Sequence, residues 1–315
     1  MRQHALHFVF VLVLCLCLSP HAAVGAALKD ASSFLTEKIP PRPFMAMTGS
    51  AFARYVSGMD RVAREHAIVD ELLKGNVPHF LRKLKPVRLF QTFADGKQMT
   101  ATIFTMPDYL AIGSDQDYLL IPMSLYSAIE IAVKFGFILP TKKIVDVIFK
   151  QSDMHFPPEP MPPGPRMTST EYYLKHNQTI EGQRLTMGFS LGGLVSGHKK
   201  DVVLTNRLAR TIGKIAIYGW HRLSGVPIQP LSTVHNATYA DYSHGIRLVS
   251  DTVLIDNKPR SIYEVLKDPK LSSLLSDEGA IGIMEAFRQF LPVNAGEWDG
   301  SISLLSKDSK ETSLP

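Results

Sequence analysis

Cysteine, long hydrophobic runs and a strong charge of either sign are all scarce in this chain. Its 315 residues include two cysteines, Cys15 and Cys17. The chain after Cys17 therefore has no disulfide, no thiolate nucleophile and no thiolate metal ligand. These absences exclude cysteine peptidases, zinc fingers and iron–sulfur proteins.

The strongly apolar run that does exist lies at the N-terminus and contains both cysteines. Residues 8–18 (FVFVLVLCLCL) follow Arg2 and end shortly before Pro20. Spanning a membrane takes about 20 apolar residues, whereas a run of this length is typical of a signal peptide. We expect a signal peptide over residues 1–26 and a secreted or extracytoplasmic protein with no stable membrane span. A short N-terminal membrane anchor is the alternative.

The rest of the composition is that of a globular protein. Hydrophobic residues make up 45% and charged residues 20%, with a net charge of +5. This small, dispersed basic excess argues against a dedicated nucleic-acid binder. The length predicts one large domain over residues 27–305, followed by a polar tail, residues 306–315, that we expect to be disordered.

The local patterns predict a mixed α+β domain of helices, hairpins and short strands. Helices are predicted over residues 52–73, 125–135, 141–150, 169–190, 260–275 and 279–290. Hairpins are predicted over 87–105 and 109–122, and buried strands over 201–205, 214–218 and 246–255. Residues 156–165 (FPPEPMPPGP) cannot form a helix or a central strand. We expect this segment to cross the domain as stiff polyproline, an interdomain linker being the alternative.

Histidine is concentrated in one part of the domain. Four histidines fall between positions 198 and 244, where an even spread would place about one: His198, His221, His235 and His244. Polar and aromatic side chains suited to catalysis or binding lie among them: Asp201, Trp220, Gln229, Tyr239, Asp241 and Arg247. The sequence therefore predicts a site in this region.

Three interpretations of the cluster compete. In the first, His244, His221 and His198 are general acid–base groups, oriented by Asp241 or Asp201, because a carboxylate fixes the tautomer of an imidazole. In the second, two or three of the four histidines and an aspartate bind a divalent metal such as zinc. In the third, the histidines are structural hydrogen-bonding groups in polar loops.

One block resembles a known family of enzymes. Ser243-His244-Gly245, followed by Ile246-Arg247-Leu248, is similar to the Ser-His-Gly-Cys-x-Arg core of L,D-transpeptidases, which cross-link peptidoglycan. Ile217-Tyr218-Gly219 resembles the strand that carries the first His-Gly of that family. The catalytic cysteine is absent here and Tyr218 replaces the histidine, so thiol transpeptidation cannot occur.

A wider resemblance involves three blocks of the same region. GHKKDVV, IYGWH and YADYSHGIRLV are similar to blocks of uncharacterised secreted proteins, most of them bacterial. This resemblance implies secretion but no particular activity.

A second motif suggests a different nucleophile. Residues 188–192 (GFSLG) match the G-x-S-x-G pattern of the nucleophile elbow, with Ser190 at its centre. The elbow needs a buried strand immediately before the serine, whereas residues 180–187 are polar. A glycine-rich helix end is the favoured interpretation, and a serine esterase or lipase is the alternative.

Together these patterns favour a secreted hydrolase with a histidine- and aspartate-centred site that acts on cell-wall, glycan or peptide material. We expect His244 to be the acid or base, Asp241 to orient it, and Arg247 to hold an anionic group. Tyr239, Trp220 and Gln229 are the expected substrate-binding residues. A secreted protein that binds a polymeric or anionic ligand without catalysis is the non-enzymatic alternative.

Overall fold

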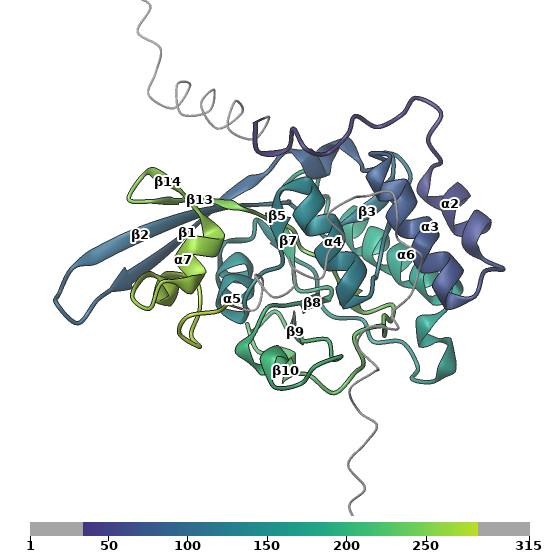
Figure 1. Ribbon diagram of the computed structural model, residues 1–315. Helices are drawn as coiled ribbons and strands as arrows, with labels where there is room; N and C mark the ends of the chain where they lie inside the picture. Colours follow the sequence, from purple (N-terminus) through teal and green to yellow (C-terminus); the bar gives the residue numbers. More distant parts are fainter. Residues whose placement is uncertain (1–33, 283–315) are drawn as a thin grey trace, which may run out of the picture.

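The computed structural model describes residues 34–282, so the predicted signal peptide, the polar tail and most of the last predicted helix lie outside the described residues. The architecture within this range is mixed α+β, as predicted (Figure 1). The helices are α2 (Gly49–Val56), α3 (Arg61–Leu73), α4 (Leu125–Phe135), α5 (Lys142–Gln151), α6 (Thr170–Thr186) and α7 (Ile262–Lys267). Short 3-10 turns are η1 (His79–Arg82), η2 (Pro165–Thr168), η3 (Asn206–Ala209) and η4 (Leu271–Leu274).

The larger sheet has the strand order β14-β13-β2-β12-β5, with β1 also paired to β2. Its strands are β1 (Lys85–Thr92), β2 (Gln98–Thr105), β5 (Phe137–Ile138), β12 (Val249–Ser250), β13 (Thr252–Ile255) and β14 (Lys258–Ser261). The β1–β2 hairpin projects from the body of the molecule in Figure 1. The turn at Asp95-Gly96, where Gly96 has a φ of 77°, confirms the hairpin predicted there.

The second sheet carries most of the predicted site and has the order β10-β9-β8-β11. Its strands are β8 (Lys200–Val202), β9 (Ile217–His221), β10 (Pro227–Ser232) and β11 (His244–Gly245). β8 runs antiparallel to β9 and parallel to β11. Two small pairs complete the strands: β3 (Ala111–Gly113) with β4 (Tyr118–Leu120), and β6 (Met154–His155) with β7 (Val195–Ser196).

One helix expected from the sequence is two helices in the structure. The prediction of a single helix over residues 52–73 is wrong, because α2 ends at Val56 and α3 begins at Arg61. The side chain of Asp60 accepts hydrogen bonds from Val62 N and Ala63 N, which caps α3. The helices predicted over 125–135, 141–150 and 169–190 correspond to α4, α5 and α6.

Two other predictions need adjustment. β9 begins at Ile217 rather than at Lys214, because Lys214 N donates to Thr211 O in a turn before the strand. Residues 258–261 form β14, which pairs with β13 across the left-handed pair Asp256-Asn257, so the helix expected from residue 260 begins later.

The proline-rich segment packs along the domain. Phe156 is fully buried, and Pro157 O accepts a hydrogen bond from Gln183 Nε2 of α6. Met161 N donates to the hydroxyl of Tyr242. These contacts favour a crossing of one domain over a free linker.

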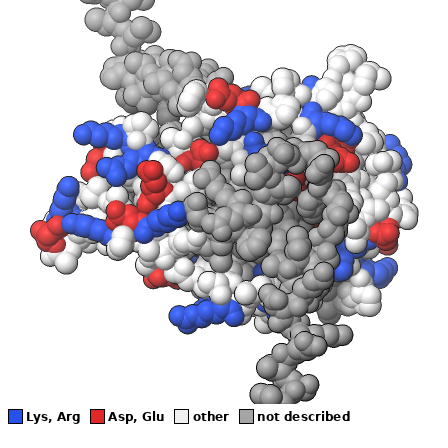
Figure 2. Space-filling model, in the orientation of Figure 1, with Lys and Arg blue, Asp and Glu red and all other residues white. Residues whose placement is uncertain are grey.

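Buried apolar side chains from the helices and both sheets form one core. Within residues 34–282, no helix combines the length and apolar character that a membrane crossing requires. On the face drawn in Figure 2, cationic and anionic side chains are interspersed.

Candidate active site

The four clustered histidines have different surroundings, although the strands of the second sheet and the loops beside them hold all four in one region. Three of them lie beside a different aspartate each: His198 beside Asp108, His221 beside Asp146, and His244 beside Asp241. The fourth, His235, stacks on Tyr239 with ring centroids 4.3 Å apart. The single shared centre expected from the sequence is therefore replaced by separate arrangements around each histidine.

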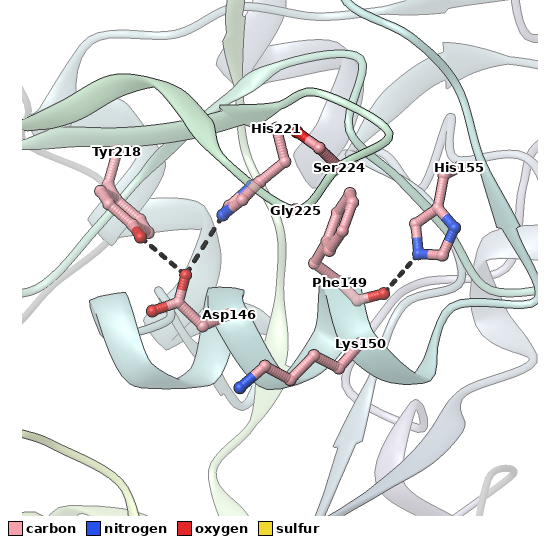
Figure 3. Close-up of a pocket in the computed structure, with 8 residues that line it drawn as sticks. All are labelled: Asp146, Phe149, Lys150, His155, Tyr218, His221, Ser224 and Gly225. Carbon is pink, nitrogen blue, oxygen red and sulfur yellow. Dashed lines mark hydrogen bonds and ion pairs between the residues drawn. The ribbon is translucent and has the colours of Figure 1, made fainter.

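His221 is the clustered histidine that lines the open pocket between α5 and the β9–β10 hairpin (Figure 3). The pocket has a volume of about 500 Å³ and is lined by Asp146, Phe149, Lys150, His155, Tyr218, His221, Ser224 and Gly225. His221 Nε2 lies 3.2 Å from Asp146 Oδ1, and the Tyr218 hydroxyl donates to the same oxygen at 2.7 Å. The ring of His221 stacks on Phe149 at 4.7 Å, which fixes its plane.

An irregular turn of the backbone brings Tyr218 and His221 to one carboxylate. Residues three apart on a regular strand point to opposite faces of the sheet. Here Gly219 has a φ of 107° and Trp220 a φ of 54°, and the second value is unusual for a bulky residue. The chain is thereby rotated within β9, and both side chains reach Asp146. Backbone strain of this kind is common at functional sites.

Asp146 is a strong acid in this setting. Burial alone would raise its pKa, but hydrogen bonds from His221, Tyr218 and Lys142 outweigh this effect and lower the pKa to about 2. The carboxylate is therefore ionised at neutral pH and can only accept hydrogen bonds. It follows that His221 Nε2 donates to Asp146, and that Nδ1 is the proton-accepting nitrogen of the neutral ring.

Asp201 lies behind His221 on β8 and has the opposite character. It is buried, and its Oδ2 accepts a hydrogen bond from the hydroxyl of Tyr109 at 2.9 Å. Burial raises its pKa to about 6, although Arg247 lies nearby with Nε 4.0 Å from Oδ1. A side chain at Gly219 would lie 3.4 Å from His221 Nδ1 and 3.5 Å from Asp201 Oδ2, so both groups border the same space.

His244 is completely buried and has no hydrogen-bond partner at either ring nitrogen. Its Nε2 is 3.9 Å from Asp241 Oδ2, which is too long for the orienting hydrogen bond expected from the sequence. Asp241 instead accepts from Ser243 N and from the hydroxyls of Ser243 and Tyr239. Burial lowers the pKa of His244, against the attraction of Asp241.

His198 belongs to a buried charge network that also includes a helix. Its Nε2 lies 3.0 Å from Asp108 Oδ1, and Arg184 of α6 donates to Asp108 Oδ2 at 2.7 Å. All three side chains are buried. Burial would raise the pKa of Asp108, but His198 and Arg184 hold it far below its usual range. The network ties α6 to the chain after β2.

Arg247 is part of the interior rather than a ligand clamp on the surface. It is 1% exposed, donates to Met106 O and Val195 O, and stacks over Tyr109 at 4.2 Å. These contacts occupy the guanidinium on several sides, and its Nε faces Asp201. This placement therefore does not support the expected role of Arg247 in holding an external anion.

The remaining predicted binding residues lie around the same sheet. Trp220 is buried on β9, with Lys200 Nζ 5.1 Å from its ring centroid. Gln229 is half-buried on β10, opposite Gly219, and its amide donates to Pro230 O. Tyr239 is half-buried in the loop before β11. None of the three lines the pocket of His221.

Ser190 is exposed and follows the end of α6 instead of a strand. Gly188, with a φ of 62°, stands in the left-handed conformation just after the helix, which is where glycine is common. The favoured interpretation of this motif, a glycine-rich helix end, is confirmed.

The described residues contain no group of three or more histidine, aspartate, glutamate or cysteine side chains placed to hold a metal ion. The candidate ligands His198, His221 and His244 each face a different carboxylate, as given above. The arrangement therefore offers acid–base pairs and no preformed zinc site in residues 34–282.

Sequence reasoning missed several residues of the site. Asp146 is 75 positions before His221, on a helix predicted correctly but without a functional signal. Phe149 and His155 line the pocket with it. Tyr109 and Asp108 lie even further from the histidine cluster. The one sequence signal for these residues is the i, i+4 spacing of Lys142 and Asp146, which predicts an ion pair on the helix but not a functional site.

Comparisons of the chain with family models, curated proteins and solved structures gave no match. The similarity to the L,D-transpeptidase core consequently rests on the quoted residues. In the structure, β8 lies between the strands that carry Tyr218 and His244.

Proposed function

We propose that the protein is a secreted hydrolase in which His221 is the general acid–base group and Asp146 orients it. The observation that carries the proposal is the convergence of His221 Nε2 and the Tyr218 hydroxyl on Asp146 Oδ1 in an open pocket. A histidine whose tautomer is fixed by an ionised carboxylate is suited to remove a proton from water.

The chemistry follows from this pair. His221 Nδ1 accepts a proton from a water molecule as the water oxygen attacks the electrophilic atom of the scissile bond. The imidazolium that forms is stabilised by Asp146, which is ionised already, and it returns the proton to the leaving group. Asp201, with a pKa of about 6, borders the space beside Nδ1, and in its ionised form it would add to the stabilisation of the imidazolium.

The pocket favours His221 over His244 as the reacting histidine. Both histidines are buried, His221 at 3% exposure, but His221 lines this pocket with Lys150 and His155, whereas His244 lines no part of it. Lys150 is exposed and provides a positive charge for an anionic group of the substrate. Cell-wall, glycan and peptide materials remain the proposed substrates, on the basis of the predicted export.

The test is substrate profiling of the purified protein over peptidoglycan, polysaccharides, peptides and esters, followed by variants of the responding activity. His221→Gln retains a nitrogen donor for Asp146 but cannot take up a proton, so kcat/KM should fall by about 10²–10⁴. Asp146→Asn should reduce it by a similar or smaller factor.

Two further variants make the outcome decisive. His79→Gln changes an exposed histidine of η1 and should leave kcat/KM unchanged. His244→Gln distinguishes the two candidate centres. Loss of activity in His244→Gln together with full activity in His221→Gln would place the chemistry at His244 and refute the proposal.

A further inference from the structure

A row of exposed apolar side chains follows the outer edge of the second sheet. β10 is the edge strand of this sheet. At one end of it, the β9–β10 hairpin exposes Leu223 (62%) and Val226 (52%), and Ile228 on the strand is 37% exposed. Beyond the other end lie Ile212 (76%) and Val234 (75%). We call these five side chains the β10 edge.

Hydrogen bonds join the two segments beyond β10 into one surface. Arg207 of η3 donates to Leu231 O at the end of β10. Lys214 Nζ donates to Val234 O, and Ala237 N donates to Gly213 O. The loop that carries Ile212 therefore lies beside the loop that carries Val234. With about 3.3 Å per residue, the six residues of β10 alone extend over roughly 20 Å.

The segment of the chain that forms this surface carries charged side chains of positive sign only. From Val202 to Ala240 the sequence contains no aspartate or glutamate, and it contains Arg207, Arg210, Lys214 and Arg222. The flanking acids Asp201 and Asp241 are buried. Glu278 contacts η3 through Thr205 and Asn206, at the border of the region. The whole chain has 34 lysine and arginine residues against 29 aspartate and glutamate residues, so the rest of the sequence contains charges of both signs in nearly equal number.

We infer that the β10 edge docks the protein on the surface of an anionic lipid bilayer. Exposed apolar side chains interspersed with cations are the features of proteins that lie in the membrane interface. The apolar groups enter the boundary between headgroups and acyl chains, while arginine and lysine meet anionic headgroups. A hydrated polyanion would satisfy the cations but leave Ile212, Leu223 and Val234 in water, so it fits this surface less well.

The same surface borders the proposed active site. Ser224 and Gly225 line the pocket of His221 and lie between Leu223 and Val226 in the hairpin. Docking through the β10 edge would hold the mouth of the pocket near the headgroups. The docking itself rests on exposure and charge and does not depend on the hydrolase proposal.

The experiment is co-sedimentation of the purified protein, without its predicted signal peptide, with two kinds of vesicle. One kind contains phosphatidylcholine alone, and in the other about one lipid in three is the anionic phosphatidylglycerol. We expect binding to the anionic vesicles that weakens as salt is raised. Ile212→Ser with Val234→Ser should lower the partition coefficient at least about tenfold. Arg210→Gln with Arg222→Gln should also lower it about tenfold or more, because two of the exposed cations that meet the anionic headgroups are removed.

Matched controls lie on other elements. Leu185→Ser on α6 and Phe90→Ser on β1 remove side chains that are 80% and 70% exposed, and neither should change vesicle binding. Equal binding to neutral vesicles, equal loss in the controls, or binding to a soluble anionic polysaccharide with none to vesicles would each overturn the inference. Hydrolysis of a small soluble substrate by Ile212→Ser/Val234→Ser should stay normal, so this proposal and the hydrolase proposal fail separately.

Discussion

The identities of the site residues were more predictable from the sequence than their partners. Histidine enrichment pointed to the region that contains His221, and Asp201 was singled out within it. The expected partner of His244 was Asp241, but 3.9 Å separates them, and the histidine with a bonded carboxylate in the pocket is His221. Its partner Asp146 comes from α5, and only the packing of that helix against β9 brings the two together.

Asp201 should make the protein less stable as the pH rises through the weakly acidic range. Its pKa is about 6 when folded, above its value of 3.8 in an unfolded chain. The unfolded state therefore loses its proton first, and stability falls between about pH 4 and pH 6. Two pKa units correspond to about 3 kcal/mol. Asp201→Asn lacks this loss. The difference in unfolding free energy between Asp201→Asn and the parent protein, measured by urea denaturation, should therefore shift in favour of the variant by about 3 kcal/mol between pH 4 and pH 7.

Asp146→Asn provides a control of opposite sign for that measurement. The folded pKa of Asp146, about 2, is below its unfolded value, so its stabilisation is present above pH 4 and is lost as the pH falls toward 2. Asp146→Asn should flatten the acid limb and leave the change between pH 4 and pH 7 intact. If Asp201→Asn had the same pH dependence as the parent protein between pH 4 and pH 7, Asp201 would have an ordinary pKa.

At the scale of elements, local patterns located most helices and hairpins but not every boundary. The helix at 125–135 coincides with α4, which Ser124 caps by accepting a hydrogen bond from Ser127 N. Between α2 and α3 the apolar spacing continues, although Gly58 and the capping Asp60 interrupt the helix. Apolar periodicity alone cannot reveal such a break. The irregular backbone at Gly219 and Trp220 also escaped prediction, because tertiary contacts stabilise it.

The cap of α3 leads to a prediction about stability. Asp60→Ala removes the acceptor for two backbone N–H groups at the start of the helix, which should cost about 1 kcal/mol. For a domain of this size, that loss lowers Tm by roughly 2–4 °C, measured by circular dichroism. Asp70→Ala, an exposed site near the other end of α3, should change Tm by less than half as much. Equal effects of the two variants would show that the cap contributes nothing.

At the scale of the whole molecule, composition predicted a core stabilised by burial. Side chains from separate parts of the chain, among them Phe52, Ile103, Phe137 and Val249, are fully buried in one cluster. The order of the strands was not predictable, since β2 pairs with β12 and β13 from the far end of the chain. Pairings at that separation depend on the whole fold rather than on any local pattern.

The scarcity of cysteine gives the last prediction. Cys15 and Cys17 precede the described residues, whose core contains no thiol, so hydrophobic burial must supply the stability. A reducing agent should therefore shift the Tm of the protein that lacks the predicted signal peptide by no more than about 1 °C. By contrast, Ile103→Ala in β2 should lower Tm by roughly 5–15 °C, because deleting a buried side chain costs about 2–5 kcal/mol. A marked loss of Tm under reduction would mean that a disulfide outside the described residues contributes to stability, and that the two cysteines remain in the processed chain.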